Sequence, residues 1–478
     1  MKALTKALAA ILVICMLFSL AACGGGATAT KAPTAAPTAA PTAAPTAAPD
    51  DGDDADDADT PSEDDVATQI AADKARVYEL REINPLAFNG LGPLSYESRK
   101  DVPKGLPREK KDPADVTIGL SAGSMSSPYF ANLILNTEAE AKKAGFNIIT
   151  QLNNGNSELA YEQMDAFVAQ GLDMIVAVTD PTTADPVFRR AVEKGIPCVA
   201  TSAQAMGKDN VVITNILSSG MIAGFLVGDY TARALYDKFP KDHVFNIGAV
   251  VFSIATGDSQ SRNTGFYAGF LYALAELDGK PYTSKWGAIV DGYTCWDNLA
   301  TKGIYDATKD GFRIDLRGYG NGNSPDAPGG QLGASDLIVA HPEIEIMTFD
   351  CDPMFPGAEI VLQQNGKTPG EDIYIACMAD GTPYGMESIK NGKIIAIGNN
   401  SSSMNSNGMV AAARAIFIDG VDMNNIIPNS YTPTVAITIE NVDEYFDPDM
   451  PMALGIDWEL EDIETYNARM AAGTGEPF

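Results

Sequence analysis

The chain has 478 residues, enough for two or more packed lobes, and its hydrophobic content of 45% is ordinary for a globular protein. The formal net charge is −30 and the isoelectric point is near 4.3. This acidity argues against nucleic acid as a partner, because nucleic-acid phosphates require a basic surface.

The first 22 residues have the pattern of an export signal. Lys2 and Lys6 give a positive start, and the apolar run from Ala7 to Leu20 is too short to span a membrane as a helix. The run ends in LAACG, which resembles the lipobox of bacterial lipoproteins, where the residue matching Cys23 becomes the mature N-terminus and carries the lipid. An ordinary signal peptide with a chance cysteine is the alternative. We expect a signal peptide over 1–22 and an extracytoplasmic protein, anchored to the cell membrane through Cys23.

Residues 23–65 have the composition of a linker. An Ala-Pro-Thr-Ala repeat runs from Ala32 to Pro49, and closely spaced prolines favour an extended, semi-rigid spacer. Ten acidic residues and no basic ones then fall between Asp50 and Asp65, a run that repels itself and stays solvated. The segment is predicted to be a stalk that holds a domain away from the membrane, or else a disordered tail without a role.

Residues 66–113 are predicted to be an extension that packs on the main domain. Val77, Leu80 and Ile83 share one face of a helix expected over Ala71–Ile83. Prolines between 85 and 107 then prevent a long regular element. No role for this extension can be inferred from its residues.

Strands and helices alternate from residue 114 to residue 445. The first unit has an apolar run at Val116–Leu120, a Ser/Gly-rich loop at Ser121–Ser127 and a helical pattern over Ala131–Ala144. Later strands are expected over 146–151, 174–178, 197–201, 211–215, 244–252, 312–318, 344–350, 373–378, 394–397 and 434–439. The alternation predicts an α/β fold of two doubly wound parallel-sheet lobes, with ligands bound at the carboxyl ends of the strands.

Three segments stand outside this alternation. Residues 280–310 contain extra material, in which Tyr293 or Trp296 could reshape the rim of a cleft. Gly318–Gly322 is rich in glycine but does not open a helix with dinucleotide-binding spacing, so we predict a loop there. Residues 446–478 are expected to form a C-terminal tail.

The loops that follow the predicted strands carry short motifs. They are SPYF at 127–130, RNTGF at 262–266, DPM at 352–354 and DGTP at 380–383, the last followed by NGK at 391–393 and Asn400. On these motifs the chain resembles type I periplasmic binding proteins, the sugar-binding receptors of ABC importers, most closely the ribose-binding type. The resemblance covers residues 115 to about 442. Its strongest part runs from Asp380 to Asn400, which keeps the family's spacing without a gap.

The resemblance implies a periplasmic binding protein type I fold whose lobes are joined by a multi-strand hinge. Lobe 1 would span about 114–215 and 401–432, lobe 2 about 216–400 and 433–445, with hinges near Asn215, Asn400 and Pro433. The residues it implies for ligand binding are Ser127, Tyr129, Phe130, Ser202, Arg262, Asp352, Asp380 and Asn400. The polar members would bind hydroxyl groups, and the two aromatic rings would cover an apolar face of the ligand.

Five of these residues also have a purely structural interpretation. Tyr129 and Phe130 could be core residues, Asp380 a turn residue, Arg262 a partner in a surface ion pair and Asp352 a helix cap. The chain also departs from the family. Ser202-Ala203 replaces a common Asp-Arg pair, so either the ligand is not a simple pentose or groups such as Asp180 and Gln204 compensate.

The implied function is capture of a small, sugar-like polar solute between two closing lobes and its delivery to the permease subunits of an ABC importer. One alternative is a receptor for a nucleoside, cyclitol or autoinducer-like ligand. Another is a ligand-sensing lipoprotein that signals to a membrane sensor. No cofactor is expected.

An enzymatic function is not expected, because no nucleophile elbow, phosphate-binding loop or metalloprotease motif is present. The two histidines, His243 and His341, lie at predicted element boundaries, where structural roles are more common. Asp350 and Asp352 could instead be the paired carboxylates of a glycosidase.

The cysteines beyond the signal region lack metal-ligand spacing, so no metal site is expected. They are Cys198, Cys295, Cys351 and Cys377. Cys295 and Cys351 could pair in an oxidising compartment.

Overall fold

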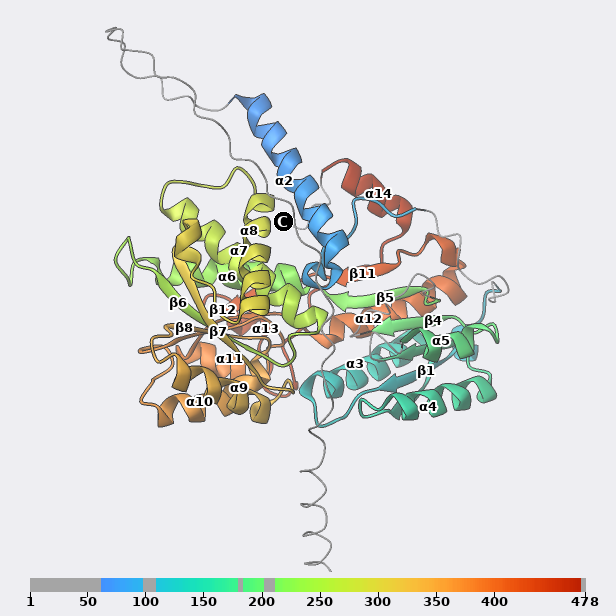
Figure 1. Ribbon diagram of the computed structural model, residues 1–478. Coiled ribbons are helices and arrows are strands. Elements are labelled where there is room, and N and C mark those ends of the chain that lie inside the picture. The colour runs from blue at the N-terminus through green and yellow to red at the C-terminus, as the bar shows by residue number, and fades with distance from the viewer. Residues whose placement is uncertain (1–61, 98–108, 179–183, 202–210, 474–478) are drawn as a thin grey trace, which may run out of the picture. The chain divides into compact units, whose positions relative to one another are not determined.

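The computed structural model describes residues 62–97, 109–178, 184–201 and 211–473, which contain two six-stranded sheets covered by helices (Figure 1). One sheet has the order β11-β5-β4-β3-β1-β2, and we call it and its helices lobe 1. The other has the order β12-β10-β9-β8-β6-β7 and belongs to lobe 2. Neighbouring strands are parallel except β10 and β12. The predicted α/β fold with two parallel-sheet lobes is confirmed.

Lobe 1 has helices on both faces of its sheet. Its strands are β1 (Thr117–Ala122), β2 (Asn147–Leu152), β3 (Met174–Ala177), β4 (Cys198–Thr201), β5 (Thr214–Ser218) and β11 (Asn429–Thr432). Its helices are α3 (Pro128–Ala144), α4 (Ser157–Gln170), α5 (Ala184–Val192) and α12 (Ser402–Arg414). Along β3, Met174 and Val176 pack with α3 and α12, whereas Ile175 and Ala177 pack with α4 and α5. This alternation is the two-sided burial expected of a parallel sheet.

Lobe 2 repeats this arrangement. Its strands are β6 (Phe245–Val251), β7 (Ile314–Asn321), β8 (Ile346–Phe349), β9 (Tyr374–Cys377), β10 (Ile394–Gly398) and β12 (Ala436–Thr438). One core cluster joins the sheet to α6 (Gly220–Tyr236), α7 (Gly257–Leu277) and α8 (Lys285–Lys302), and a second joins it to α9 (Ala327–Ala340), α10 (Phe355–Gln364) and α11 (Pro383–Lys390). On β8, Ile346 belongs to the first cluster and Met347 and Phe349 to the second.

The predicted loop at Gly318–Gly322 was wrong, because Gly318–Asn321 form the end of β7. A Cβ atom on Gly320 would lie 2.0 Å from the carbonyl oxygen of Gly333, so glycine lets α9 approach this strand closely. The strand expected over 211–215 begins three residues later, at Thr214, and continues to Ser218. Its register is set by pairing with β4 and β11, which a local pattern does not contain.

The segment 280–310 is mainly helical. Helix α8 begins after Ser284, whose hydroxyl accepts a hydrogen bond from the backbone of Gly287. Trp286, Tyr293 and Trp296 all join the core of lobe 2, and Trp296 is 1% exposed. The prediction that Tyr293 or Trp296 shapes a cleft rim was therefore wrong.

The two ends of the described chain meet outside the two sheets. Helix α2 (Glu63–Ile83) begins at the cap Ser62, so the acidic residues Glu63–Asp65 form its first turn instead of a solvated linker. The turn η1 (Pro85–Phe88) follows. In the C-terminal segment, α14 (Ile463–Ala471) contacts the extension, where the hydroxyl of Tyr466 donates to the carbonyl of Pro93 at 2.9 Å.

The remaining helical segments are short. They are η2 (Pro113–Asp115), η3 (Ala307–Asp310), η4 (Asp352–Met354), η5 (Ala415–Asp419), η6 (Met423–Asn425) and α13 (Val442–Tyr445). Across the parts of the chain that the structure describes, no helix combines the length and apolar character needed to cross a membrane.

The described chain passes between the two sheets after β5, after β10 and between β11 and β12. Ser218 is the last residue of β5, and Asn400 closely follows β10. The predicted hinge points near Asn400 and Pro433 lie at two of these passages, whereas Asn215 lies within β5, three residues before the first passage. The same passages bring the carboxyl ends of strands from both lobes to one region.

Candidate functional site

A cavity of about 290 Å³ is lined by the last residues of β5 and by residues that follow β1, β6, β7, β8, β9 and β10. Its volume suits a small solute, because the smallest pockets for drug-sized ligands have volumes of about 300 Å³. Among the predicted site residues, those in its wall are Ser127, Tyr129, Phe130, Arg262, Asp380 and Asn400. Ser202 lies outside the described residues, and Asp352 is not in the wall.

Asp380 projects into the cavity from a strained turn after β9. Its φ is +87°, a region that non-glycine residues seldom occupy and that Asp and Asn tolerate best. Its side chain accepts a hydrogen bond from Nδ2 of Asn400 at 3.2 Å. Asp380, Asn400 and Arg262 are 8%, 6% and 7% exposed, so these polar groups face the cavity and not bulk solvent.

Asp352 lies behind Asp380 and supports its turn. The backbone N–H groups of Gly381 and Thr382 donate to its two carboxylate oxygens at 2.7 and 3.0 Å, and the hydroxyl of Thr382 donates as well. The carboxylate is fully buried, and these hydrogen bonds come from Gly381 and Thr382 and not from the helical turn that Asp352 begins. The structure therefore places Asp352 neither in contact with the cavity nor at a helix cap, but as a buried brace for the residues that position Asp380.

Arg262 reaches the cavity from the second turn of α7. Its Nη1 donates to the backbone carbonyl of Asp350 at 3.1 Å, and its Nη2 lies 3.7 Å from Oδ1 of Asp258. Its Nε is buried and has no hydrogen-bond partner among the described residues. Arg262 is thus held in place through Nη1 and Nη2, and its Nε remains available as a hydrogen-bond donor.

Asp350 is fully enclosed by protein donors. Its carboxylate accepts from the backbone N–H of Phe252 at 2.9 Å, from Nδ2 of Asn263 at 3.2 Å and from the hydroxyl of Ser259. Asp350 and Asp352 both stay out of the cavity wall. The paired carboxylates considered for a glycosidase therefore do not face a common ligand space.

The buried carboxyl groups have altered acidity. Burial raises the pKa of Asp380 to about 7, while the positive charge of Arg262 opposes the rise. Burial also raises the pKa of Asp350 and of Asp352 to about 6, and their hydrogen-bond donors limit the increase. A ligand hydroxyl that donates to Asp380 favours its ionised form, so binding and proton loss at Asp380 are coupled.

Aromatic rings form another part of the wall. Tyr129 and Phe130, in the first turn of α3, meet edge to face with centroids 5.4 Å apart, and Phe252 follows β6. The hydroxyl of Tyr129 accepts a hydrogen bond from Nδ2 of Asn405 at 2.7 Å. Apolar faces beside carboxylate, amide and guanidinium groups match a ring that carries hydroxyls on its edge.

A hydrogen-bonded chain crosses between the lobes at the cavity. The hydroxyl of Ser218, at the end of β5 in lobe 1, donates to Oδ1 of Asn400, and Asn400 in turn donates to Asp380 of lobe 2. Two of the three passages between the sheets therefore meet in the cavity wall.

The sequence-based prediction missed several residues that also line the cavity, among them Asn89, Ser218, Phe252, Asp258, Pro325 and Asp326. Ser218 was missed because β5 was placed three residues too early. Phe252 and Asp258 belong to the segment that ends β6 and begins α7, so their position after a strand was a usable signal. Asn89 comes from the N-terminal extension, and no feature of the sequence pointed to it.

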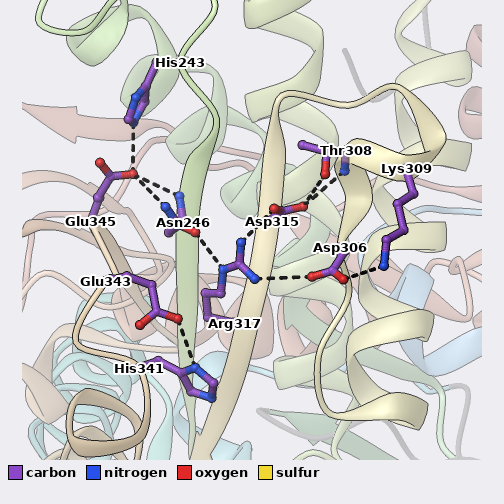
Figure 2. A network of polar contacts seen from close by, with 10 residues as sticks. All are labelled: His243, Asn246, Asp306, Thr308, Lys309, Asp315, Arg317, His341, Glu343 and Glu345. Atoms are coloured by element: carbon purple, nitrogen blue, oxygen red, sulfur yellow. Dashed lines mark hydrogen bonds and ion pairs between the residues drawn. The ribbon is translucent and has the colours of Figure 1, made fainter.

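Both histidines lie in the polar network shown in Figure 2, near the amino ends of β6 and β8 and away from the cavity. Nε2 of His243 lies 3.0 Å from Oε2 of Glu345, and Nδ1 of His341 lies 3.2 Å from Oε1 of Glu343. Arg317 contacts Asp315 and Asp306 in the same network. The structure thus places both histidines beside glutamate carboxylates and not at the candidate site.

The four cysteines within the described residues are free and buried, so the pairing of Cys295 with Cys351 does not occur in this structure. Cys351 lines the cavity, and burial raises the pKa of its thiol well above the usual value. Over the described ranges, no three His, Cys, Asp or Glu side chains come together in a way that could hold a metal ion.

The two parallel-sheet lobes and the polar cavity at their strand ends define a two-lobed solute-binding protein. Residues 118–420, well over half of the chain, match the family described as periplasmic binding protein domain. The chain therefore belongs to the periplasmic binding protein family, as the sequence motifs predicted.

Relatives with known names agree with this assignment. The chain is 26% identical over 284 residues to the ribose import binding protein of Salmonella typhimurium, an alignment that covers 59% of this chain and 77% of that protein. A Mycobacterium smegmatis structure in complex with β-D-fucofuranose aligns with a TM-score of 0.54 at 20% identity, covering 69% of this chain and 94% of that one.

A periplasmic solute binding protein of an ABC transporter from Actinobacillus succinogenes, with bound D-allose, also has a TM-score of 0.54. It is 16% identical, and the alignment covers 69% of this chain and 100% of that one. At such identities the two solved structures support the fold.

Proposed function

We propose that this protein binds a neutral monosaccharide in the cavity and delivers it to an ABC importer. The observation that carries the proposal is the convergence of Asp380, Arg262 and Asn400 with aromatic rings in one cavity of about 290 Å³. In this assignment Asp380 accepts from sugar hydroxyls, Nε of Arg262 donates to one, and Tyr129 and Phe130 cover the apolar face of the ring. A neutral ligand is favoured because Asp258 and Asp380 already face the charge of Arg262.

The importer role rests on family membership and on the named relatives, which include an import binding protein and an ABC transporter component. Closure of two lobes over a solute would create the surface that permease subunits recognise. The hydrogen-bonded chain from Ser218 to Asp380 through Asn400 supports this assignment, because it links both lobes at the proposed ligand.

A thermal-shift screen of D-ribose, D-allose, D-galactose, D-fucose, myo-inositol and adenosine should identify a stabilising sugar. A ligand at roughly 100 times its Kd adds about 2.7 kcal/mol to the free energy of unfolding. Stabilisation by a monosaccharide supports the proposal. Stabilisation by adenosine or myo-inositol alone would instead favour the nucleoside or cyclitol receptor, and no shift with any compound would contradict binding of this class.

We also propose that Cys23 carries the lipid anchor and that residues 24–61 form the stalk. Cys23 and the stalk both lie outside the described residues. The support is the LAACG motif and the Pro-rich and acidic composition that follows it. Changing Cys23 to serine should move the exported protein from the membrane fraction to the soluble fraction of cells. Persistent membrane attachment of that variant would refute the anchor.

A further inference from the structure

The N-terminal extension is built into the core of lobe 2, although it precedes the matched family domain at 118–420. Val77 and Leu80 of α2 and Ala87, Phe88 and Leu91 of the following turn are all buried in the cluster that includes α6, α7 and α8. The ring of Phe88 lies 5.2 Å from that of Tyr293 on α8. The extension is therefore a fixed part of the lobe.

The turn between α2 and residue 92 is held against the first turns of α6 and α7. The carbonyl oxygens of Asn89 and Gly90 accept hydrogen bonds from the backbone of Met221 and the hydroxyl of Ser219, both at 3.2 Å. Gly90 has a φ of +101°, and a Cβ atom there would lie 2.5 Å from Oγ of Ser219, so only glycine permits this approach. Nδ2 of Asn84 also donates to Oε1 of Gln260 on α7 at 2.9 Å.

These contacts place Asn89 of the turn in the wall of the candidate site. Asn89 lines the cavity together with Asp258 and Arg262, which lie on the adjacent α7. Its Oδ1 is buried and accepts no hydrogen bond from the described residues. A buried amide oxygen without a partner is costly, and a ligand hydroxyl would satisfy it.

We propose that Asn89 contacts the ligand directly, so that the N-terminal extension provides a specificity-determining residue of the binding site. Its amide would accept a hydrogen bond from one hydroxyl of the bound sugar. The backbone of Asn89, and not its side chain, holds the turn against α6, so the side chain is available for recognition. The inference rests on the proposed function, because it assigns a residue to the same sugar site.

The test measures affinity by titration calorimetry with the full chain and the monosaccharide that stabilises it most in the panel above. Asn89→Ala should weaken binding about tenfold, and the unfolding temperature of the free protein should stay unchanged. Asn89→Ser is a second small replacement that should weaken binding similarly. The matched control is Asn84→Ala, which removes a side-chain bond from the same turn outside the cavity and should keep affinity within about twofold.

Deoxy analogues of that sugar give an independent readout. The analogue that lacks the hydroxyl bound by Asn89 should bind the wild type about tenfold more weakly than the parent sugar does. Asn89→Ala should bind this analogue and the parent sugar with equal affinity. Unchanged affinity of Asn89→Ala would overturn the assignment, as would an equal loss in Asn84→Ala, which would show that the extension acts through docking alone. Failure of the wild type to bind any panel sugar would instead remove the proposed function, and this inference with it.

Discussion

Replacing Asp380 by asparagine should weaken binding of the identified sugar about 10- to 100-fold without unfolding the protein. The substitution removes a charged acceptor that is 8% exposed and faces the cavity. Asparagine is preferable to alanine here because the φ of +87° suits Asn and strains Ala. Titration calorimetry on both proteins measures the loss of affinity.

The same pair of proteins should differ in pH dependence. Because burial raises the pKa of Asp380 to about 7, this carboxyl is largely protonated in the free wild-type protein below pH 7. It must lose that proton to offer ligand hydroxyls a charged acceptor. The affinity of the wild-type protein should therefore fall as the pH decreases from 8 to 6, by up to about tenfold per unit below the pKa. Asp380→Asn should show a flat profile over this range.

The raised pKa also has a consequence for stability. The carboxyl groups of Asp350, Asp352 and Asp380 have a lower pKa in the unfolded state than in the native state. Between about pH 4 and 7 the native state therefore binds more protons at these groups than the unfolded state does. These groups therefore favour the ligand-free fold at acidic pH, and their contribution is lost as the pH rises through 7. Asp380→Asn should remove the share that belongs to Asp380.

Asp315→Asn is the matched control for Asp380. Asp315 is also 8% exposed, but it pairs with Arg317 near the amino end of β7, away from the cavity (Figure 2). This control should leave the affinity and its pH profile unchanged. Equal binding by Asp380→Asn and the wild type at every pH would remove Asp380 from the site.

Replacing Arg262 by methionine should lower the free energy of unfolding by about 3–5 kcal/mol near neutral pH and abolish tight sugar binding. Arg262 is 7% exposed and is the positive charge that faces Asp258 and Asp380. Methionine fills a similar volume, so the loss reports the uncompensated carboxylates and the donor missing from the cavity. Urea unfolding at pH 7.5 and 5.5 measures the loss in free energy of unfolding relative to the wild type. This loss should be smaller at pH 5.5 because Asp380 is then protonated.

Arg317→Met is the control for Arg262. Arg317 also pairs with two carboxylates, those of Asp306 and Asp315, but its side chain is 22% exposed and lies outside the cavity. The Arg317→Met substitution should lower the free energy of unfolding by about 1 kcal/mol and leave sugar affinity intact. If Arg262→Met were no more harmful than this control in stability or binding, the central role of Arg262 would be wrong.

Most strands of the parallel sheets were predictable because they are short apolar runs, whereas the polar strand β11 (Asn429–Thr432) was not predicted. Ile175, Val176 and Ala177 of β3, for example, are at most 1% exposed, and such a run between polar loops has few other interpretations. The loops of the candidate site followed from the same pattern, because parallel strands place their carboxyl ends together. Arg262, Asp380 and Asn400 meet for this reason, although they lie far apart in the sequence.

The roles of neighbouring carboxylates were not predictable. Asp352 and Asp380 both follow strands, yet only Asp380 faces the cavity. The difference arises because the backbone N–H groups of Gly381 and Thr382 bind Asp352, and this depends on the φ values of the turn. Asn89 was hidden for a similar reason, since its place depends on how Gly90 docks on Ser219, a contact between segments 129 positions apart.

The described residues between 62 and 473 form one compact unit, whereas the family domain spans only 118–420. The folded unit thus contains more of the chain than the family domain does. One residue of the cavity wall, Asn89, lies in the part that precedes the family domain. With Asn89 as the proposed ligand contact, two proteins that share the domain but differ upstream of it would select different sugars. For members with such a leading segment, transferring a ligand name from domain similarity alone ignores part of the molecule that chooses the ligand.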